Sequence, residues 1–291
     1  MKILLIGANG KLGTALQAVL RPVGQISAYS RTELDITDQG AVSKIIEQDS
    51  PDIVLNASAY TNVRGAETDR GTAEAVNATA VGELGSRAAR QGAIVIHIST
   101  DFVFDGTAHS PYREDDATGP LNVYGSSKLI GERALIESGA ACAILRTAWL
   151  YDSGPNNFVG VMIARTKAGD PLRVVDDQIG SPTSVPVLAQ AIRAMLTRSP
   201  DALRRLLTVG PVFHTVCRGR ASWFDLALAA IEDAGLSTDG LSPISTDQSG
   251  ETLKRPANSV LDCSRFEQTF SVRLPHWRAA ARSVVASRPQ D

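Results

Sequence analysis

The chain has 291 residues, a formal net charge of -2 and 43% hydrophobic residues. Nearly balanced charge gives no electrostatic reason to expect nucleic acid or an anionic membrane as a partner. No stretch approaches the roughly 20 apolar residues of a transmembrane helix, and an apolar run follows Met1 too closely for a secretory signal, so we expect a cytoplasmic enzyme. The three cysteines are odd in number and far apart, which supports neither a disulfide framework nor a metal site.

Short apolar runs alternate with helical periodicity through the first half of the chain. The helical segments repeat apolar residues from Leu12 to Leu20 and from Val76 to Ala88. The apolar runs, which we expect to be strands, are Ile3–Ile6, Ile26–Tyr29, Ile53–Leu55, Ile94–Ile98 and Ala143–Leu145. Because the runs are apolar throughout, they predict a parallel sheet covered on both faces, an α/β doubly wound Rossmann fold.

The second half has a looser pattern. Residues 152–157 read as a loop, Val174-Val175 as a strand, and Val187–Leu196 as a helix. Residues 198–221 are irregular and basic, which we interpret as a solvated surface. Ser222 and Asp225 predict a capped helix that stops at Gly235. We expect residues 1–150 to form the dinucleotide-binding domain, completed by about 172–196, and residues 151–171 and 197–291 to form a smaller C-terminal α/β substrate-binding lobe.

Three glycines follow the first predicted strand. Gly7, Gly10 and Gly13 lie between that strand and an amphipathic helix, where they permit a tight turn and the approach of backbone N–H groups to a pyrophosphate. The second strand ends in Ser30-Arg31 rather than in an acidic residue that would bind a ribose. A hydroxyl and a guanidinium suit a 2′-phosphate, which favours NADP(H), with NAD(H) as the alternative.

Further residues are placed to flank the same cofactor. Asp35 and Ile36 would lie beside the adenine, although Asp35 could equally be a turn residue or helix cap. The segment Ala59, Tyr60 and Thr61 follows the third strand and would pack on the other half of the cofactor.

Tyr124 and Lys128 are four residues apart in a segment that predicts a helix after Pro120. Residues at this spacing share one helix face, so the phenol and the ammonium would point into one cleft. A neighbouring positive charge lowers the pKa of a phenol, which would make Tyr124 a usable general acid. Thr100, at a strand end, could donate a hydrogen bond to a substrate oxygen that gains negative charge. Together these residues predict the reduction of a ketone.

Several motifs carry a family resemblance. They resemble the dTDP-4-dehydrorhamnose reductases of the extended short-chain dehydrogenase/reductase superfamily, closely over residues 1–196, poorly to residue 221, and again around Trp223 and Arg255. The motifs are Gly7-Ala-Asn-Gly-Lys-Leu-Gly13, Asn56-Ala-Ser-Ala-Tyr-Thr61, Ser99-Thr-Asp-Phe-Val-Phe-Asp-Gly106, Pro120-Leu-Asn-Val-Tyr-Gly-Ser-Ser-Lys128, Asp176-Asp-Gln-Ile-Gly-Ser-Pro-Thr183 and Arg255-Pro-Ala-Asn-Ser259.

The resemblance implies NAD(P)H-dependent reduction of the keto group of dTDP-4-dehydro-L-rhamnose to dTDP-L-rhamnose, with Thr100, Tyr124 and Lys128 as the catalytic residues. It also implies a nucleotide-sugar substrate and leaves a homodimer open. Cofactor contacts are implied for Asn9, Lys11 and Leu12 within the glycine motif, and substrate contacts for Phe102, Trp149, Asn157, Gln178 and Arg255. Core packing is the alternative for Trp149, and a surface ion pair is the alternative for Arg255.

Two departures from the family pattern bear on the substrate. Phe102 stands where tyrosine is usual, and Arg64-Gly65 stands where Asp-Lys is common, so the sugar and the nucleotide base stay open. A dehydratase would need an acid and a base after the threonine, and Phe102 cannot transfer a proton. An epimerase or a reductase of another nucleotide sugar is a weaker alternative. A non-catalytic NADP-binding subunit resembling the methionine adenosyltransferase β subunit is another.

Overall fold

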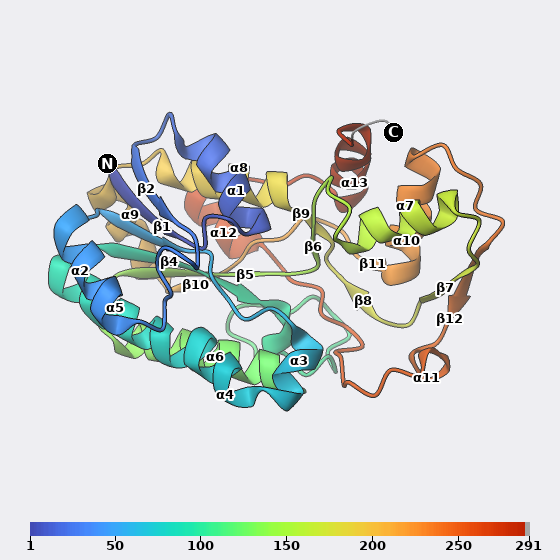
Figure 1. The fold of residues 1–291 in the computed structure, drawn as a ribbon, viewed down its shortest axis with the longest axis horizontal. Coiled ribbons are helices and arrows are strands. Elements are labelled where there is room, and N and C mark those ends of the chain that lie inside the picture. The colour runs from blue at the N-terminus through green and yellow to red at the C-terminus, as the bar shows by residue number, and fades with distance from the viewer. Residues whose placement is uncertain (289–291) are drawn as a thin grey trace.

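The computed structural model describes residues 1–288 and is built on a six-stranded parallel sheet (Figure 1). Its strand order is β2 (Gln25–Tyr29), β1 (Lys2–Ile6), β3 (Ile53–Asn56), β4 (Ile94–Thr100), β5 (Cys142–Thr147) and β10 (Val212–His214). The order reverses direction between β1 and β3, because the chain adds β2 on one side of β1 and all later strands on the other. Such a switch point is where open parallel sheets bind ligands.

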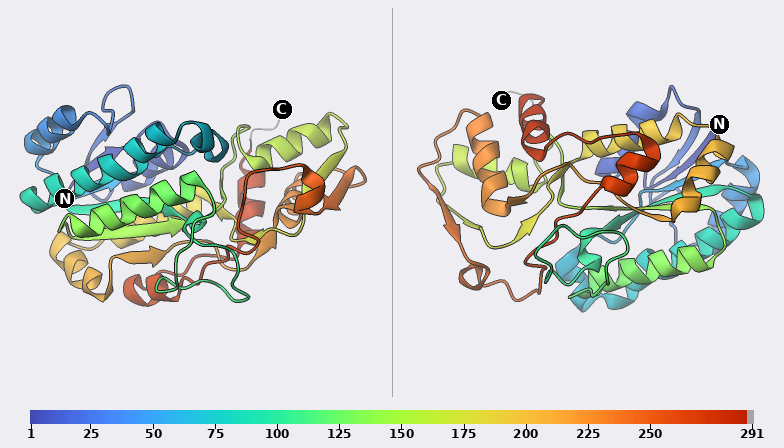
Figure 2. Two further views of the ribbon diagram at one scale, coloured as in Figure 1. Left: turned by 90° about the horizontal axis from the view of Figure 1, so that it is seen from below. Right: turned by 180° about the vertical axis from the view of Figure 1, so that it is seen from behind.

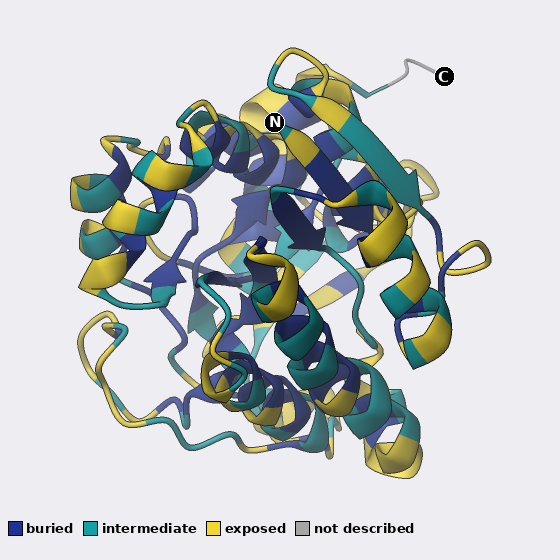
Figure 3. Cartoon of the chain, turned by 90° about the vertical axis from the view of Figure 1, so that its left-hand side faces the viewer, coloured by how far each residue is buried: buried dark blue, intermediate teal, exposed yellow. Residues whose placement is uncertain are grey.

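Helices cover both faces of this sheet, as the apolar strand runs predicted. Ile3 and Leu5 of β1 are buried in one apolar cluster, and Leu4 and Ile6 are buried in a second cluster on the opposite face of the sheet. The first face carries α1 (Lys11–Leu20), α8 (Val185–Leu196), α9 (Pro200–Leu206) and α12 (Ser264–Phe270), and the second carries α2 (Gln39–Asp49), α5 (Ala80–Gln91) and α6 (Val123–Glu137). Figure 3 shows buried strands between helices whose outer faces are exposed. The Rossmann fold is confirmed.

A smaller lobe lies beyond the carboxyl ends of the strands (Figure 2). Its apolar cluster joins α7 (Phe158–Lys167), α10 (Trp223–Asp233) and α13 (Trp277–Ala286). Three two-stranded ladders complete it, formed by β7 (Leu172–Val175) with β12 (Leu241–Ile244), β8 (Ile179–Gly180) with β11 (Ala221–Ser222), and β6 (Leu150–Tyr151) with β9 (Thr183–Ser184). The predicted cap of α10 is present as a reciprocal Ser222–Asp225 capping box.

Short connecting elements complete the chain. They are α3 (Val63–Thr68), α4 (Arg70–Glu74), a π-helix η1 (Ala75–Thr79), the 3-10 turns η2 (Asp101–Val103) and η3 (Leu207–Val209), and α11 (Thr246–Ser249). Within residues 1–288, no helix is long and apolar enough to cross a membrane.

The prediction that residues 198–221 are an irregular, solvated surface is wrong. Ser199 caps α9, and β10 pairs with β5 at the edge of the main sheet. Phe213 of β10 is buried against Phe266 and Phe270 of α12. A strand of three residues is too short to show a hydrophobic period, and the arginines around β10 made the segment look like exposed surface.

These contacts also bear on the expected domain boundary. The expected division assigned residues 197–291 to the smaller lobe, whereas α9, β10 and α12 pack on the main sheet. The last three residues of that range, 289–291, lie outside the described residues. The division into two separate domains remains a prediction. The small lobe does not include α9, β10 and α12.

Candidate active site

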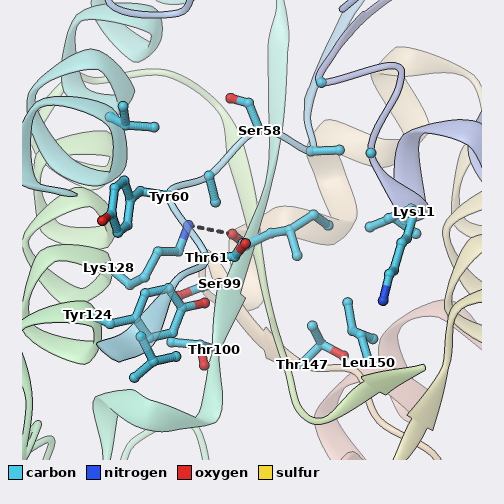
Figure 4. A pocket seen from close by; sticks show the side chains of 18 of the residues that line it. Lys11, Ser58, Tyr60, Thr61, Ser99, Thr100, Tyr124, Lys128, Thr147 and Leu150 are labelled. Carbon is cyan, nitrogen blue, oxygen red and sulfur yellow. Dashed lines mark hydrogen bonds between the residues drawn. The ribbon is translucent and has the colours of Figure 1, made fainter. Parts of the chain in front are cut away.

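A cavity of about 720 Å³ opens at the carboxyl ends of β1, β3, β4 and β5, at the switch point of the sheet. It is bounded on the far side by residues of the smaller lobe, Trp223 and Arg255 among them. Figure 4 shows Lys11 across the cavity from Tyr124 and Lys128. The expected site residues that line it are Gly7, Asn9, Gly10, Lys11, Leu12, Arg31, Asp35, Ile36, Ala59, Tyr60, Thr61, Thr100, Phe102, Tyr124, Lys128, Trp149 and Arg255. Gly13, Ser30, Asn157 and Gln178 do not line it.

The glycine turn has the shape of a phosphate cradle. Gly7 adopts φ +85, and a Cβ there would lie 2.8 Å from the Ala57 carbonyl carbon. Gly13 does not line the cavity but contacts the turn that does, because a Cβ at this position would lie 2.1 Å from the Gly7 oxygen. Only glycine therefore lets α1 approach β1 so closely that its first N–H groups face the cavity. The residues present fit a bound dinucleotide pyrophosphate.

The end of β2 provides one exposed cation. Arg31 is 77% exposed at its side chain and forms a 3.4 Å ion pair with Asp35. Asp35 also accepts hydrogen bonds from the backbone and hydroxyl of Thr37. These contacts are those of a turn residue, which was the alternative expected for Asp35. Ser30 is buried and donates to Glu33 Oε2 at 2.6 Å, which commits its hydroxyl to the turn.

The segment after β3 is held by Asn77, a buried residue of the π-helix that the sequence did not reveal. Asn77 Oδ1 accepts from Tyr60 N at 2.9 Å, and its Nδ2 donates to Tyr60 O at 3.1 Å and to Ser127 Oγ at 3.0 Å. Ser127 belongs to α6, so one amide ties the Tyr60 segment to the helix that carries Tyr124 and Lys128.

Tyr124 and Lys128 enter the cavity from the start of α6, which Asn122 caps by accepting from Gly125 N. The Thr100 hydroxyl lies beside the phenol (Figure 4). Burial raises the pKa of Tyr124 to about 12, which the nearby Asp101 reinforces and the Thr100 hydroxyl partly offsets. Tyr124 is therefore a neutral phenol near pH 7.

Lys128 points toward β4 rather than toward the phenol. Its Nζ donates to Ile98 O at 2.7 Å and lies 2.9 Å from His97 Nε2. Burial lowers the pKa of Lys128 to about 8, and Glu132 partly offsets this. The prediction that Lys128 lowers the pKa of Tyr124 is wrong for this arrangement, because burial outweighs other influences on the phenol.

His97 is a second buried group that the sequence did not reveal. Its Nδ1 lies 3.1 Å from Asn56 Nδ2, and Asn56 Oδ1 accepts from the backbone and the hydroxyl of Ser58. Burial and the neighbouring Lys128 hold the pKa of His97 well below its ordinary value, so the imidazole is neutral. A neutral imidazole has one acceptor nitrogen, so His97 can accept from Asn56 or from Lys128, but not from both.

Asp101 contributes a buried carboxyl beside the phenol. Its Oδ1 accepts from the Thr100 hydroxyl at 3.1 Å. Burial raises the pKa of this carboxyl to about 6, against hydrogen bonds from Ser259 and Thr100 that lower it. The Asp101 carboxyl is therefore protonated more readily than an exposed aspartate.

Two tryptophans, one from each lobe, stack at the wall of the cavity. Trp149 and Trp223 lie with ring centroids 3.6 Å apart and nearly parallel planes. Trp149 has φ 48, and a Cβ on Gly180 would lie 2.6 Å from its indole. Phe102 packs edge-on against Tyr124 at 5.8 Å, and the Arg255 guanidinium lies 5.9 Å from the Phe102 ring.

The two remaining expected substrate residues lie elsewhere. Asn157 caps α7, and its Nδ2 donates to Asp152 and Gly154, so its polar atoms are used within its own loop. Gln178 lines an adjacent cavity of about 410 Å³, which shares Trp223 and Arg255 with the main one. Its Nε2 donates to Thr246 Oγ1 at 3.0 Å.

The fold and the site together define an oxidoreductase of the short-chain dehydrogenase/reductase type, in which a glycine turn for a dinucleotide faces a hydroxyl, a phenol and a lysine. A family model described as the RmlD substrate binding domain matches residues 1–288. The chain belongs to this family of dTDP-4-dehydrorhamnose reductases.

Curated relatives and solved structures agree. The dTDP-4-dehydrorhamnose reductase of Burkholderia thailandensis is 38% identical, with 98% of each chain covered, and that of Escherichia coli K12 is 37% identical, with 98% of this chain and 97% of the relative covered. A Bacillus anthracis dTDP-4-dehydrorhamnose reductase, solved in complex with NADP, has a TM-score of 0.90 at 31% identity, with 98% of each chain covered.

Proposed function

We propose that this protein reduces the 4-keto group of dTDP-4-dehydro-L-rhamnose to the alcohol of dTDP-L-rhamnose, using NADPH. The observation that carries the proposal is the Thr100 hydroxyl beside the Tyr124 phenol, on the floor of a cavity that the Gly7 turn closes at its other end. The family membership and the names of the relatives support a reductase rather than an epimerase or a regulatory subunit. A nucleotide-sugar substrate and a cytoplasmic location are parts of the proposal.

The cofactor would lie along the Gly7 turn, with its phosphates at the first N–H groups of α1 and its adenosine end near Arg31. NADPH is preferred because a guanidinium rather than a carboxylate follows β2, and the NADP complex of the Bacillus anthracis relative supports this preference. When bound, the cofactor supplies the hydride that adds to the carbonyl carbon.

Side chains of the cavity supply the proton to the substrate oxygen and stabilise the negative charge that develops on it. Thr100, whose hydroxyl donates to Asp101 Oδ1 in the structure, would turn that donor to the carbonyl oxygen. Tyr124 transfers its proton to the same oxygen as the C–O bond order falls. The resulting phenolate recovers a proton from solvent, so one ketone, one hydride and one proton give one alcohol. Lys128 is protonated below its pKa of about 8 and donates to Ile98 O, so it adds a positive charge to this side of the cavity without contacting the phenol.

The test is the decay of NADPH absorbance with dTDP-4-dehydrorhamnose for the wild type and for Tyr124→Phe. The variant keeps the ring and its contact with Phe102 but loses the proton, so turnover should fall by about 10²-fold or more while NADPH affinity is retained. Tyr29→Phe is the matched control, because its hydroxyl lies against Asp49 away from the cavity. Tight NADP binding without wild-type turnover would contradict the proposal and favour a regulatory subunit.

A further inference from the structure

Two arginines hold one carboxylate at the edge of the smaller cavity. Arg64 Nη2 lies 2.7 Å from Glu251 Oε2, and Arg255 Nη2 lies 3.9 Å from the same oxygen. Arg64 belongs to α3 of the large lobe, whereas Glu251 and Arg255 follow α11 in the small lobe. All three line the cavity of about 410 Å³. The cluster therefore joins segments that lie far apart in the sequence, and it carries one surplus positive charge.

The carboxylate of Glu251 is held weakly by the exposed arginine. Arg64 is 75% exposed at its side chain, and an ion pair with such a partner contributes only about 0–1 kcal/mol. The pKa of Glu251 is lowered, first by the Leu253 backbone N–H and then by the two arginines, so the group is an ionised carboxylate near neutral pH. A ligand with more negative charge can replace it on the guanidinium groups.

The cluster is connected to the reacting end of the main cavity through packed rings. The Arg255 guanidinium lies 5.9 Å from the Phe102 ring, and Phe102 packs edge-on against Tyr124. Arg255 and Trp223 line both cavities. A ligand whose sugar ring lies beside Tyr124 would therefore extend past Phe102 toward the two guanidinium groups.

Gly65 follows Arg64 at the start of α3 and has little room for a side chain. A Cβ there would lie 2.7 Å from the Tyr60 hydroxyl and 2.5 Å from Asn62 Nδ2. Glycine lets the start of α3 pack closely on the Tyr60 segment of the cavity wall, with Arg64 beside it at the mouth of the smaller cavity.

We propose that Arg64 joins Arg255 in binding the diphosphate of the nucleotide sugar, and that the phosphates displace Glu251 from Arg64. Planar guanidinium groups match phosphate oxygens in pairs, and two such groups balance the two negative charges of a diphosphate diester. The proposal rests on the proposed function for the identity of the ligand as a nucleotide sugar. It goes further in naming Arg64 as a residue that binds the diphosphate and Glu251 as a carboxylate that competes with the phosphates for Arg64.

The experiment measures the binding of thymidine diphosphate, uridine diphosphate and thymidine by calorimetry, which needs no turnover. Arg64→Ala should weaken the binding of the diphosphates by about tenfold or more and leave the affinity for thymidine unchanged. Glu251→Gln should strengthen diphosphate binding, because it removes the competing charge. Arg70→Ala is the matched control, since Arg70 forms an equally short exposed ion pair with Glu74 on α4 and lines neither cavity.

The outcomes separate this proposal from the proposed function. Unchanged diphosphate affinity in Arg64→Ala, or an equal loss for thymidine, would overturn the role of Arg64. Weaker binding in Glu251→Gln would overturn the displacement and make Glu251 a residue that positions the arginines. Arg64-dependent binding of uridine diphosphate without binding of thymidine diphosphate would uphold the diphosphate site and contradict the proposed substrate.

Discussion

Replacing Lys128 with methionine should stabilise the fold near neutral pH while reducing turnover. Lys128 is 1% exposed, and burial lowers its pKa from 10.5 to about 8. This shift means that burying the charged ammonium lowers the free energy of unfolding by roughly 3 kcal/mol. Methionine keeps the length of the side chain and removes the charge. The variant also loses the hydrogen bond to Ile98 O, which costs about 1–2 kcal/mol of stability. The free energy of unfolding should therefore rise by about 1–2 kcal/mol in the variant.

The sign of the effect depends on pH in a defined window. The folded-state pKa of Lys128 is lowered, so between about pH 8 and pH 10.5 the unfolded chain binds more protons and wild-type stability rises with pH. Below that window the ammonium is charged in both states and the penalty is fully present. Above it the penalty is gone, and only the lost hydrogen bond separates the two proteins. The methionine variant should therefore be the more stable protein below the window and the less stable one above it.

The measurement is the free energy of unfolding in urea for both proteins at about pH 7, 8, 9 and 10. Lys44→Met is the control, because Lys44 is exposed on α2 and its replacement should change stability little at any of these values. Titrating groups away from Lys128 are common to both proteins and cancel in the difference. His97, whose pKa Lys128 lowers, is neutral over this pH range in the wild type, so it adds little to the difference. A difference that stays constant with pH, or a wild type that is more stable at about pH 7, would refute the reasoning.

Two further predictions concern the cofactor site. Arg31→Ala should weaken the affinity for NADPH by about tenfold and leave that for NADH nearly unchanged, because only NADPH carries a phosphate for the guanidinium; equal losses in titrations with both cofactors would remove the argument for NADPH. Gly13→Ala should abolish NADPH binding and destabilise the fold by about 2–3 kcal/mol, since its Cβ would lie 2.1 Å from a carbonyl oxygen of the glycine turn. Gly71→Ala, where nothing lies within 4 Å of the new Cβ, is the control in thermal unfolding.

Features coded by local signals could be predicted from the sequence. The strand Ile3–Ile6, the glycine turn and helix α1 follow one another within 20 residues, and each carries its own pattern. The spacing of Tyr124 and Lys128 fixes their common helix face, whatever the rest of the chain does. The fold and the pair of catalytic candidates were therefore accessible before the structure.

Features set by long-range packing could not be predicted in this way. Asn77 and His97 carry no motif, and their importance comes from burial among segments that lie 17 to 50 residues away. The pKa of Tyr124 depends on how deeply the phenol is enclosed, and a helix-face argument contains no information on enclosure. The family resemblance implied a ligand role for Asn157 and met the same limit, because the Asp152 and Gly154 carbonyls already accept from its amide.

Burial raises the pKa of Tyr124 and lowers that of Lys128, and the two shifts have different consequences for reduction. Near pH 7 a phenol is protonated at a pKa of about 12 just as it is at its ordinary value of 10, so burial leaves Tyr124 with its proton but makes it a weaker acid than an exposed tyrosine. The Thr100 hydroxyl acts against this effect, because its hydrogen bond lowers the pKa of Tyr124. Lys128, with a pKa near 8, is still mostly charged near pH 7. The enclosure that costs the fold stability at Lys128 therefore also weakens Tyr124 as an acid, so the hydrogen bond from Thr100 is the contact on which proton transfer depends.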